Sequence, residues 1–180
     1  MLTKNFDGKK ITIRQLLEKD LKSPKKFQNF INSLVEEEAQ IKINKKKSLG
    51  EEKEWLKEQL RKIKEHKAVF LVAEHDNAII GSTGIELGRG RKGHIGNFGI
   101  GIKKGYRGMG LGSYLMKKIL NLAKKELRPK PKIIRLSVFP TNKVAIKLYK
   151  KYGFRKVATI PDQLQYKDRL ISEVIMLLYL

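Results

Sequence analysis

The sequence contains no cysteine and no apolar run long enough to cross a membrane. Without cysteine, the chain can form no disulfide, no thiolate zinc site and no cysteine nucleophile. The longest apolar stretch near the end, residues 174–180, is far shorter than the roughly 20 residues of a membrane-spanning helix. Residues 1–10 also lack the continuous apolar core of a signal peptide. We therefore expect a cytoplasmic protein that does not enter a membrane.

Acidic residues are scarce, with 18 Asp and Glu against 40 Lys and Arg, which gives a formal net charge of +22. A field of that sign attracts polyanions such as nucleic acid or a phosphate-rich cofactor. The lysines are spread along the whole chain, and no recognised nucleic-acid-binding motif is present. A solvated lysine-rich surface is the favoured explanation, so nucleic acid is a candidate partner only through net charge.

A length of 180 residues with 41% apolar residues predicts a single domain over residues 1–180. Periodicity and turn signals predict strands at 10–14, 68–73, 78–87, 94–102, 133–138, 154–160 and 170–180. Helices are expected after Ser23-Pro24, after a capping box formed by Ser48 and Glu51, from the glycine-rich turn to about residue 127, and at 141–152. This order predicts an α/β fold, with a mixed central sheet of about seven strands flanked by helices.

A glycine-rich turn lies between the strand that ends at Ile102 and the following helix. It consists of Arg107, Gly108, Met109, Gly110, Leu111, Gly112 and Ser113. Glycine allows a tight turn, and the first N–H groups of the helix have no partner within it. Such a helix start binds phosphate oxygens. The spacing fits neither a Walker loop nor G-x-G-x-x-G, so another phosphate-bearing ligand is predicted.

About thirty residues later the chain carries a second motif, N-x-x-A-x-x-L-Y-x-x-x-G-F, from Asn142 to Phe154. Together with R-x-x-G-x-G from Arg107 to Gly112, it resembles the two signatures of the GNAT N-acetyltransferase superfamily. The segment from Tyr166 to Met176 is similar to the closing strand of the amino-acid and phosphinothricin acetyltransferases. The resemblance covers roughly residues 70–180, so we expect a GNAT-like fold.

The resemblance implies an EC 2.3.1 enzyme that moves an acetyl group from acetyl-CoA, as co-substrate, to a primary amine. The amine would attack directly, through a tetrahedral intermediate. The parallel strands at 94–102 and 133–138 should separate to admit the pantetheine arm, with the backbone of Ile100 and Ile102 bonding to it. The turn from Arg107 to Ser113 should grip the pyrophosphate. Asn142 should bond to the cofactor or, with equal weight, serve only as a helix N-cap.

Tyr149, at the tyrosine of the second signature, is the expected general acid that protonates the departing thiolate, since a phenol stays protonated at neutral pH. Relatives often carry a carboxylate where this chain has Asn97, and an amide cannot act as a base. We therefore rank Glu86 first as the general base, with His94 and a chain of waters as alternatives. Three histidines without recognisable ligand spacing predict no metal site.

The acceptor is expected to be a small-molecule or peptide amine. Six glutamates, Glu36, Glu37, Glu38, Glu51, Glu52 and Glu54, could attract a cationic amine, although solvated helix ends are the favoured explanation. The net charge points instead to acidic partners such as ribosomes. A non-catalytic acyl-CoA sensor and a nucleic-acid-binding module remain as alternatives. The resemblance also allows a homodimer, because dimers are common among similar proteins, but it leaves the oligomeric state open.

Overall fold

The computed structural model describes residues 2–180, which form eight strands, four α-helices and two short 3₁₀ helices. In chain order these are β1 (Leu2–Phe6), β2 (Lys9–Gln15), η1 (Glu18–Lys22), α1 (Pro24–Glu36), α2 (Leu49–Lys64), β3 (Ala68–His75), β4 (Ala78–Leu87), η2 (Gly90–Lys92), β5 (Ile95–Ile102), α3 (Leu111–Glu126), β6 (Ile133–Val138), α4 (Lys143–Lys151), β7 (Arg155–Tyr166) and β8 (Arg169–Tyr179). The α/β class and the GNAT-like order of elements that the sequence predicts are confirmed.

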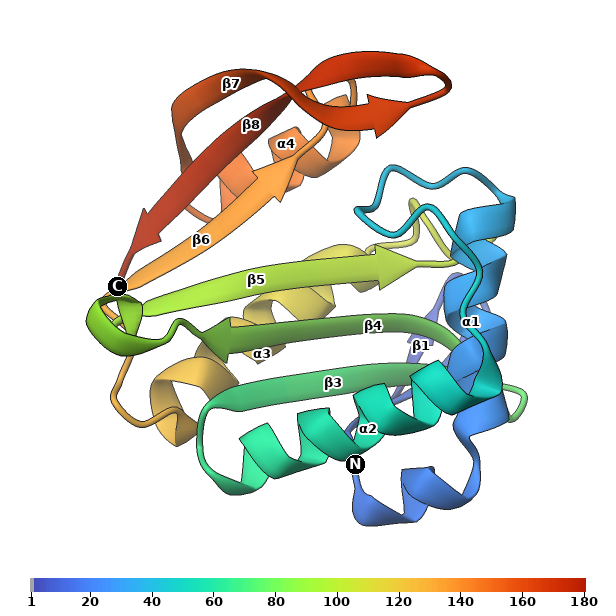
Figure 1. Ribbon diagram of the computed structural model, residues 1–180. Helices are drawn as coiled ribbons and strands as arrows, with labels where there is room; N and C mark the ends of the chain where they lie inside the picture. Colours follow the sequence, from blue (N-terminus) through green and yellow to red (C-terminus); the bar gives the residue numbers. More distant parts are fainter. Residues whose placement is uncertain (1) are drawn as a thin grey trace.

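All eight strands form one mixed sheet, in the order β1-β2-β3-β4-β5-β6-β8-β7. Every neighbouring pair is antiparallel except β5 and β6, which run parallel. Helices α1 and α2 cover one face of the sheet, and α3 covers the other (Figure 1). The parallel pair therefore lies in the middle of the sheet, between an antiparallel half from β1 to β5 and a smaller half formed by β6, β8 and β7.

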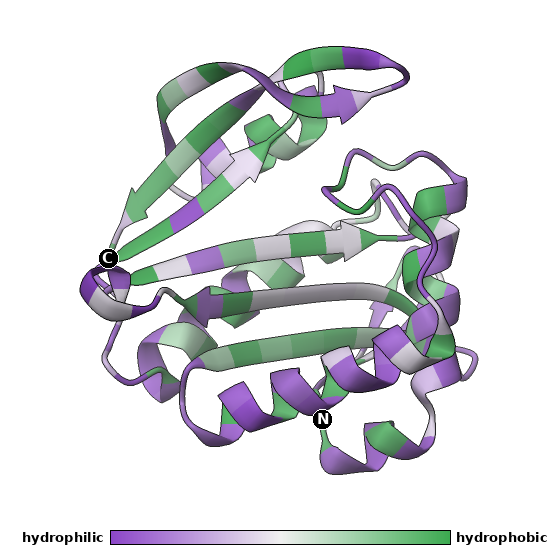
Figure 2. Cartoon of the chain, viewed as in Figure 1, coloured by the Kyte–Doolittle hydropathy of each residue, from purple (hydrophilic) through white to green (hydrophobic). Residues whose placement is uncertain are grey.

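Apolar side chains are packed on both faces of this sheet. Buried residues of α3 pack against β3 to β6 and β8, and a separate cluster joins α1 and α2 to β3. Figure 2 shows β3 as an almost continuous apolar strand, whereas the outer side of α2 is hydrophilic. The chain thus buries its helices by one apolar stripe each and leaves the charged side to solvent.

Two strand predictions differ from the structure. The hairpin turn at Asp7-Gly8 connects β2 to a strand that the sequence pattern did not reveal, β1, in which only Phe6 is buried. An edge strand with exposed side chains has no alternating pattern to detect. The strand expected to end at residue 160 runs on to Tyr166, because an irregularity between Ile160 and Leu164 accommodates Pro161 within β7.

Candidate active site

The two central parallel strands are paired for only part of their length. Residues Ile95–Asn97 of β5 pair with Ile133–Arg135 of β6, and neither strand pairs with the other beyond that point. From there the strands diverge like the arms of a V (Figure 1). A cleft of about 1580 Å³ runs along the gap, lined by the far halves of both strands, by α1 and α2, and by the start of α3.

The glycine-rich turn lies at one end of this cleft. Gly108 and Gly110 have φ angles of +85° and +86°, and a Cβ built on either would contact nothing within 4 Å. The left-handed backbone explains why these positions are glycine, and the open space above them leaves room for a ligand. Helix α3 begins directly afterwards without a side-chain cap, so its first N–H groups are free to bind an anion. The turn therefore fits a phosphate-bearing group.

Gly99, in the middle of β5, is the glycine of this strand that leaves space open. A Cβ on Gly96 would approach Ile85 and Ile134 side chains at 2.7 and 2.8 Å, and one on Gly101 would lie 2.9 Å from Leu34. Nothing lies within 4 Å of a Cβ on Gly99, whose carbonyl accepts a hydrogen bond from Thr83 Oγ1 at 2.9 Å. The glycines at 96 and 101 are therefore required for packing, whereas Gly99 lines the cleft with open space beside it.

The Arg107 side chain already has hydrogen-bond and ion-pair partners within the protein. Its Nε donates to the carbonyl of Ile102 at 2.7 Å, and its Nη2 is ion-paired with Glu37 at the end of α1. The other Glu37 oxygen accepts from the backbone N–H of Lys104 at 3.1 Å. The Glu37 carboxylate therefore neutralises the positive charge of Arg107, which the sequence suggested would face the pyrophosphate. It also links the end of α1 to the turn.

Tyr149 projects from α4 into the edge of the cleft. Its ring packs in a T-shaped arrangement on Phe98, with centroids 5.9 Å apart, and also contacts Phe154. Burial raises the pKa of its hydroxyl to about 12. No hydrogen bond within residues 2–180 engages that hydroxyl. Every side-chain nitrogen or oxygen of those residues that is fully shielded from solvent has a hydrogen-bond partner, so the Tyr149 hydroxyl is not fully shielded. The hydroxyl therefore opens to the cleft as a protonated donor.

Asn142 and Tyr152 hold the ends of α4. The Asn142 Oδ1 accepts from the backbone N–H of Ala145 at 3.1 Å, which confirms its N-cap role, while the residue also lines the cleft. The Tyr152 hydroxyl donates to the carbonyl of Ser113 at 2.6 Å and lies 2.8 Å from the Ser113 Oγ. Tyr152 is therefore a structural link between α4 and the start of α3.

Glu86 lies at the end of β4, directly across from Asn97 on β5. Its Oε1 forms an ion pair with Lys62 Nζ of α2 at 2.8 Å, and its side chain is about one-third exposed, at 37%. Asn97 donates only a long hydrogen bond, 3.4 Å, to the Glu86 carbonyl. Both residues line the cleft, whereas His94 does not. Of the side chains considered for the base, Glu86 is therefore the one that the cleft can use.

The fold brings most of the residues singled out in the sequence to one cleft. The residues expected to bind the cofactor or to act in catalysis all line it except Met109 and Leu111, whose side chains pack into the core beneath α3. His94 and three of the six glutamates, Glu36, Glu51 and Glu54, do not line it. Sequence patterns pointed to neither Gln59 nor Trp55 as a site residue, although both line the cleft together with Glu52. A capping box marks the start of α2, but nothing in the sequence shows which side of that helix meets a ligand.

Comparison with known proteins agrees with this geometry. Residues 31–154 match the acetyltransferase (GNAT) family. The L-amino acid N-acetyltransferase AaaT of Escherichia coli is 38% identical over 85 residues, which cover 47% of this chain and 51% of AaaT. The chain thus spans about half the length of that relative.

Two solved structures share the fold along nearly the whole chain. A GNAT-family acetyltransferase from Streptococcus pneumoniae superposes with a TM-score of 0.82 at 24% identity, covering 94% of this chain and 99% of that one. The acetyltransferase yncA from Salmonella typhimurium, solved with its cofactor acetyl-CoA, gives a TM-score of 0.77 at 18% identity over 94% and 93% of the two chains. At these identities the likeness concerns the fold.

Proposed function

This chain belongs to the acetyltransferase (GNAT) family, and on that basis we propose that it transfers an acetyl group from acetyl-CoA to a primary amine. The observation that carries the proposal is the early end of pairing between β5 and β6, beside the glycine-rich turn. Where two neighbouring strands are not hydrogen-bonded to each other, their facing backbone N–H and C=O groups need other partners. An extended, amide-bearing ligand such as the pantetheine arm can satisfy them as an added strand.

In this proposal the two ends of acetyl-CoA meet different parts of the cleft. The backbone N–H groups from Gly108 to Ser113 bind the pyrophosphate, and the backbone of Ile100 and Ile102 bonds to the pantetheine. The carbonyl of Ile102 is held by Arg107, so its bonding to the cofactor requires that arginine to move or to share the oxygen. The Asn142 amide nitrogen, which has no partner within residues 2–180 while the side-chain oxygen caps α4, supplies a further donor.

The thioester supplies the activated acetyl group, and the protein supplies donors and proton carriers around it. Amide N–H groups beside Gly99 are placed to stabilise the oxyanion that develops when the amine attacks. The carbon–nitrogen bond forms, the carbon–sulfur bond breaks, and the Tyr149 hydroxyl gives its proton to the departing thiolate. A hydroxyl held protonated by burial suits that role because it does not ionise at neutral pH.

The attacking amine must lose protons, and we propose that Glu86 accepts one of them. Its carboxylate lines the cleft on β4, opposite Asn97, which has no basic group of its own. The ion pair with Lys62 fixes the orientation of Glu86, and that pair lies on the α2 side of the sheet. Water in the open part of the cleft can carry the proton onward to solvent.

Calorimetry with acetyl-CoA and a free-thiol assay with a panel of amines test this function. We expect acetyl-CoA to bind and at least one amine to release coenzyme A catalytically. Binding without release from any amine, including free amino acids, polyamines and basic peptide N-termini, would indicate an acyl-CoA sensor instead. The match to AaaT makes amino-acid-like amines the first to examine. Absence of acetyl-CoA binding would contradict the whole assignment.

A further inference from the structure

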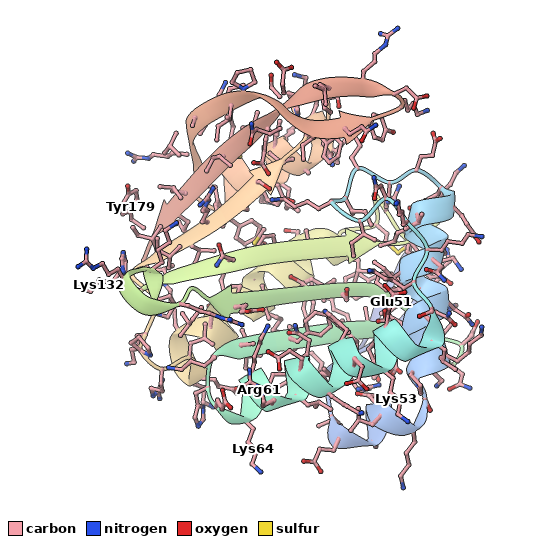
Figure 3. The ribbon with its side chains drawn as sticks, in the orientation of Figure 1. Glu51, Lys53, Arg61, Lys64, Lys132 and Tyr179 are labelled. Carbon is pink, nitrogen blue, oxygen red and sulfur yellow. The ribbon has the colours of Figure 1, made fainter. Side chains whose placement is uncertain are left out.

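Helix α2 presents two buried polar side chains to the cleft that the reaction outlined above does not use. Glu52 and Gln59 are 6% and 9% exposed, and both line the cleft on the α1 and α2 side of the sheet. They lie seven residues apart on one helix face, with Trp55 between them. In Figure 3 the labelled Glu51 marks the end of α2 near α1 where Glu52 follows, and Arg61 and Lys64 mark the opposite end.

The Glu52 carboxylate has no partner of its own. Lys47, whose positive charge acts on Glu52, is ion-paired with Glu51 at 3.0 Å. No hydrogen bond or ion pair within residues 2–180 reaches the Glu52 oxygens. Every side-chain oxygen there that is fully shielded from solvent does have a hydrogen-bond partner, so the Glu52 oxygens are not fully shielded. The carboxylate is therefore withdrawn from the surface but open to the cleft. A buried carboxylate without a partner is costly, which favours a role in binding a ligand.

The start of α2 is held rigidly, so Glu52 is fixed in place. Gln28 and Asn32 of α1 both donate to the carbonyl of Lys47, at 2.9 and 3.0 Å, and Asn32 Oδ1 accepts from the Lys47 N–H at 2.7 Å. The capping box between Ser48 and Glu51 fixes the next turn. Hydrogen-bonded support of this kind is what a binding residue requires.

The surroundings of Glu52 are apolar and aromatic. Trp55 packs edge-on against Phe70 of β3 with ring centroids 5.3 Å apart, and Phe27 of α1 lines the same part of the cleft. A ligand here meets one negative charge, then aromatic faces and edges, then the amide of Gln59. Cations bind well beside aromatic rings and carboxylates, whereas the same carboxylate repels anions.

We propose that Glu52 binds a positive charge carried by the acceptor separately from the amine that is acetylated. The acceptor class is then an amine with an apolar middle and a second, cationic end. A separate cation fits because the acetylated amine must become neutral to react, while the second group keeps its charge throughout. The inference rests on the proposed acetyl transfer and specifies its substrate.

Two primary amines that differ at the end far from the reacting nitrogen test the proposal. In 4-guanidinobutylamine one end is a permanent cation that cannot be acetylated, while n-pentylamine has only the reacting amine. We expect kcat/KM to be at least about tenfold higher for the guanidino compound, as for a charged hydrogen bond. Glu52→Gln should raise KM for that compound about tenfold with little change in kcat, and should leave n-pentylamine nearly unchanged.

Glu54→Gln is the matched control, because Glu54 is an exposed glutamate of the same helix that pairs only with Lys57. It should leave both amines unaffected, and Glu52→Asp should keep much of the preference because it keeps the charge. Equal use of the two amines by the parent chain, use of neither despite binding of acetyl-CoA, or equal losses for both in Glu52→Gln would each overturn the inference. Failure to bind acetyl-CoA would instead overturn the proposed function.

Discussion

Replacing Glu52 by glutamine should make the protein more stable at alkaline pH, because it removes a buried charge that has no partner. Burial raises the pKa of the Glu52 carboxyl to about 7, although Lys47 opposes the rise and Glu51 adds to it. An unfolded glutamate titrates near pH 4.3. Between these values the folded protein binds more protons than the unfolded chain, so the parent's stability falls as the pH rises through that window.

The size of the effect follows from the pKa difference. A rise from about 4.3 to about 7 corresponds to at most roughly 3.7 kcal/mol, at about 1.4 kcal/mol per pH unit. Water in the cleft reaches the carboxylate and screens it, so we expect a pH-dependent difference of about 1–2 kcal/mol between the two proteins. The gain should be largest above pH 7 and should vanish as the pH falls toward about 4.

Urea denaturation at about pH 5 and about pH 8.5 measures this difference through the midpoint, provided that the m-values agree. Glu54→Gln serves as the control, since its exposed carboxylate should give the same result at both pH values. A Glu52→Gln protein that is less stable than the parent at pH 8.5 would show that the carboxylate supports the fold. An equal midpoint difference at both pH values would show that Glu52 titrates normally. Either result would contradict the account of an unpartnered charge.

Five further substitutions, in three parts of the site, test the proposed chemistry. Tyr149→Phe should lower kcat about tenfold or more, equivalent to ~1.4 kcal/mol, while calorimetry gives an unchanged Kd for acetyl-CoA; unchanged turnover would remove Tyr149 from the mechanism. Arg107→Glu should weaken acetyl-CoA binding, since it places two carboxylates beside the turn. Glu37→Gln should strengthen that binding, because it releases the arginine from its ion pair. If both variants bind acetyl-CoA with the same Kd as the parent protein, the ion pair has no part in cofactor binding. Glu86→Gln should lower kcat/KM for amines most strongly near neutral pH, and Lys62→Met is the companion that removes only its ion-pair partner. If Glu86→Gln has the same pH–rate profile as the parent protein, water rather than Glu86 accepts the proton of the amine.

Local signals in the sequence were sufficient for much of the fold and for the shape of the glycine-rich turn. Gly108 and Gly110 were identified because a left-handed turn before a helix favours glycine, and the structure has both at positive φ. The capping box at Ser48 and Glu51 and the N-cap at Asn142 could likewise be predicted, because each depends on residues only three positions apart. The edge strand β1 was not predicted, since its side chains are exposed and follow no period.

The sequence by itself determined the class of fold, the glycine-rich turn and the position of Tyr149, because helix starts, turns and apolar periods are set by neighbours along the chain. Only the tertiary structure decided where pairing between β5 and β6 stops, that Glu37 forms an ion pair with Arg107, and that Glu52 faces the cleft without a partner among residues 2–180. These features join residues that are distant in sequence. Whether a glutamate is solvated, paired or left alone depends on the surfaces that fold against it, and no local pattern encodes them.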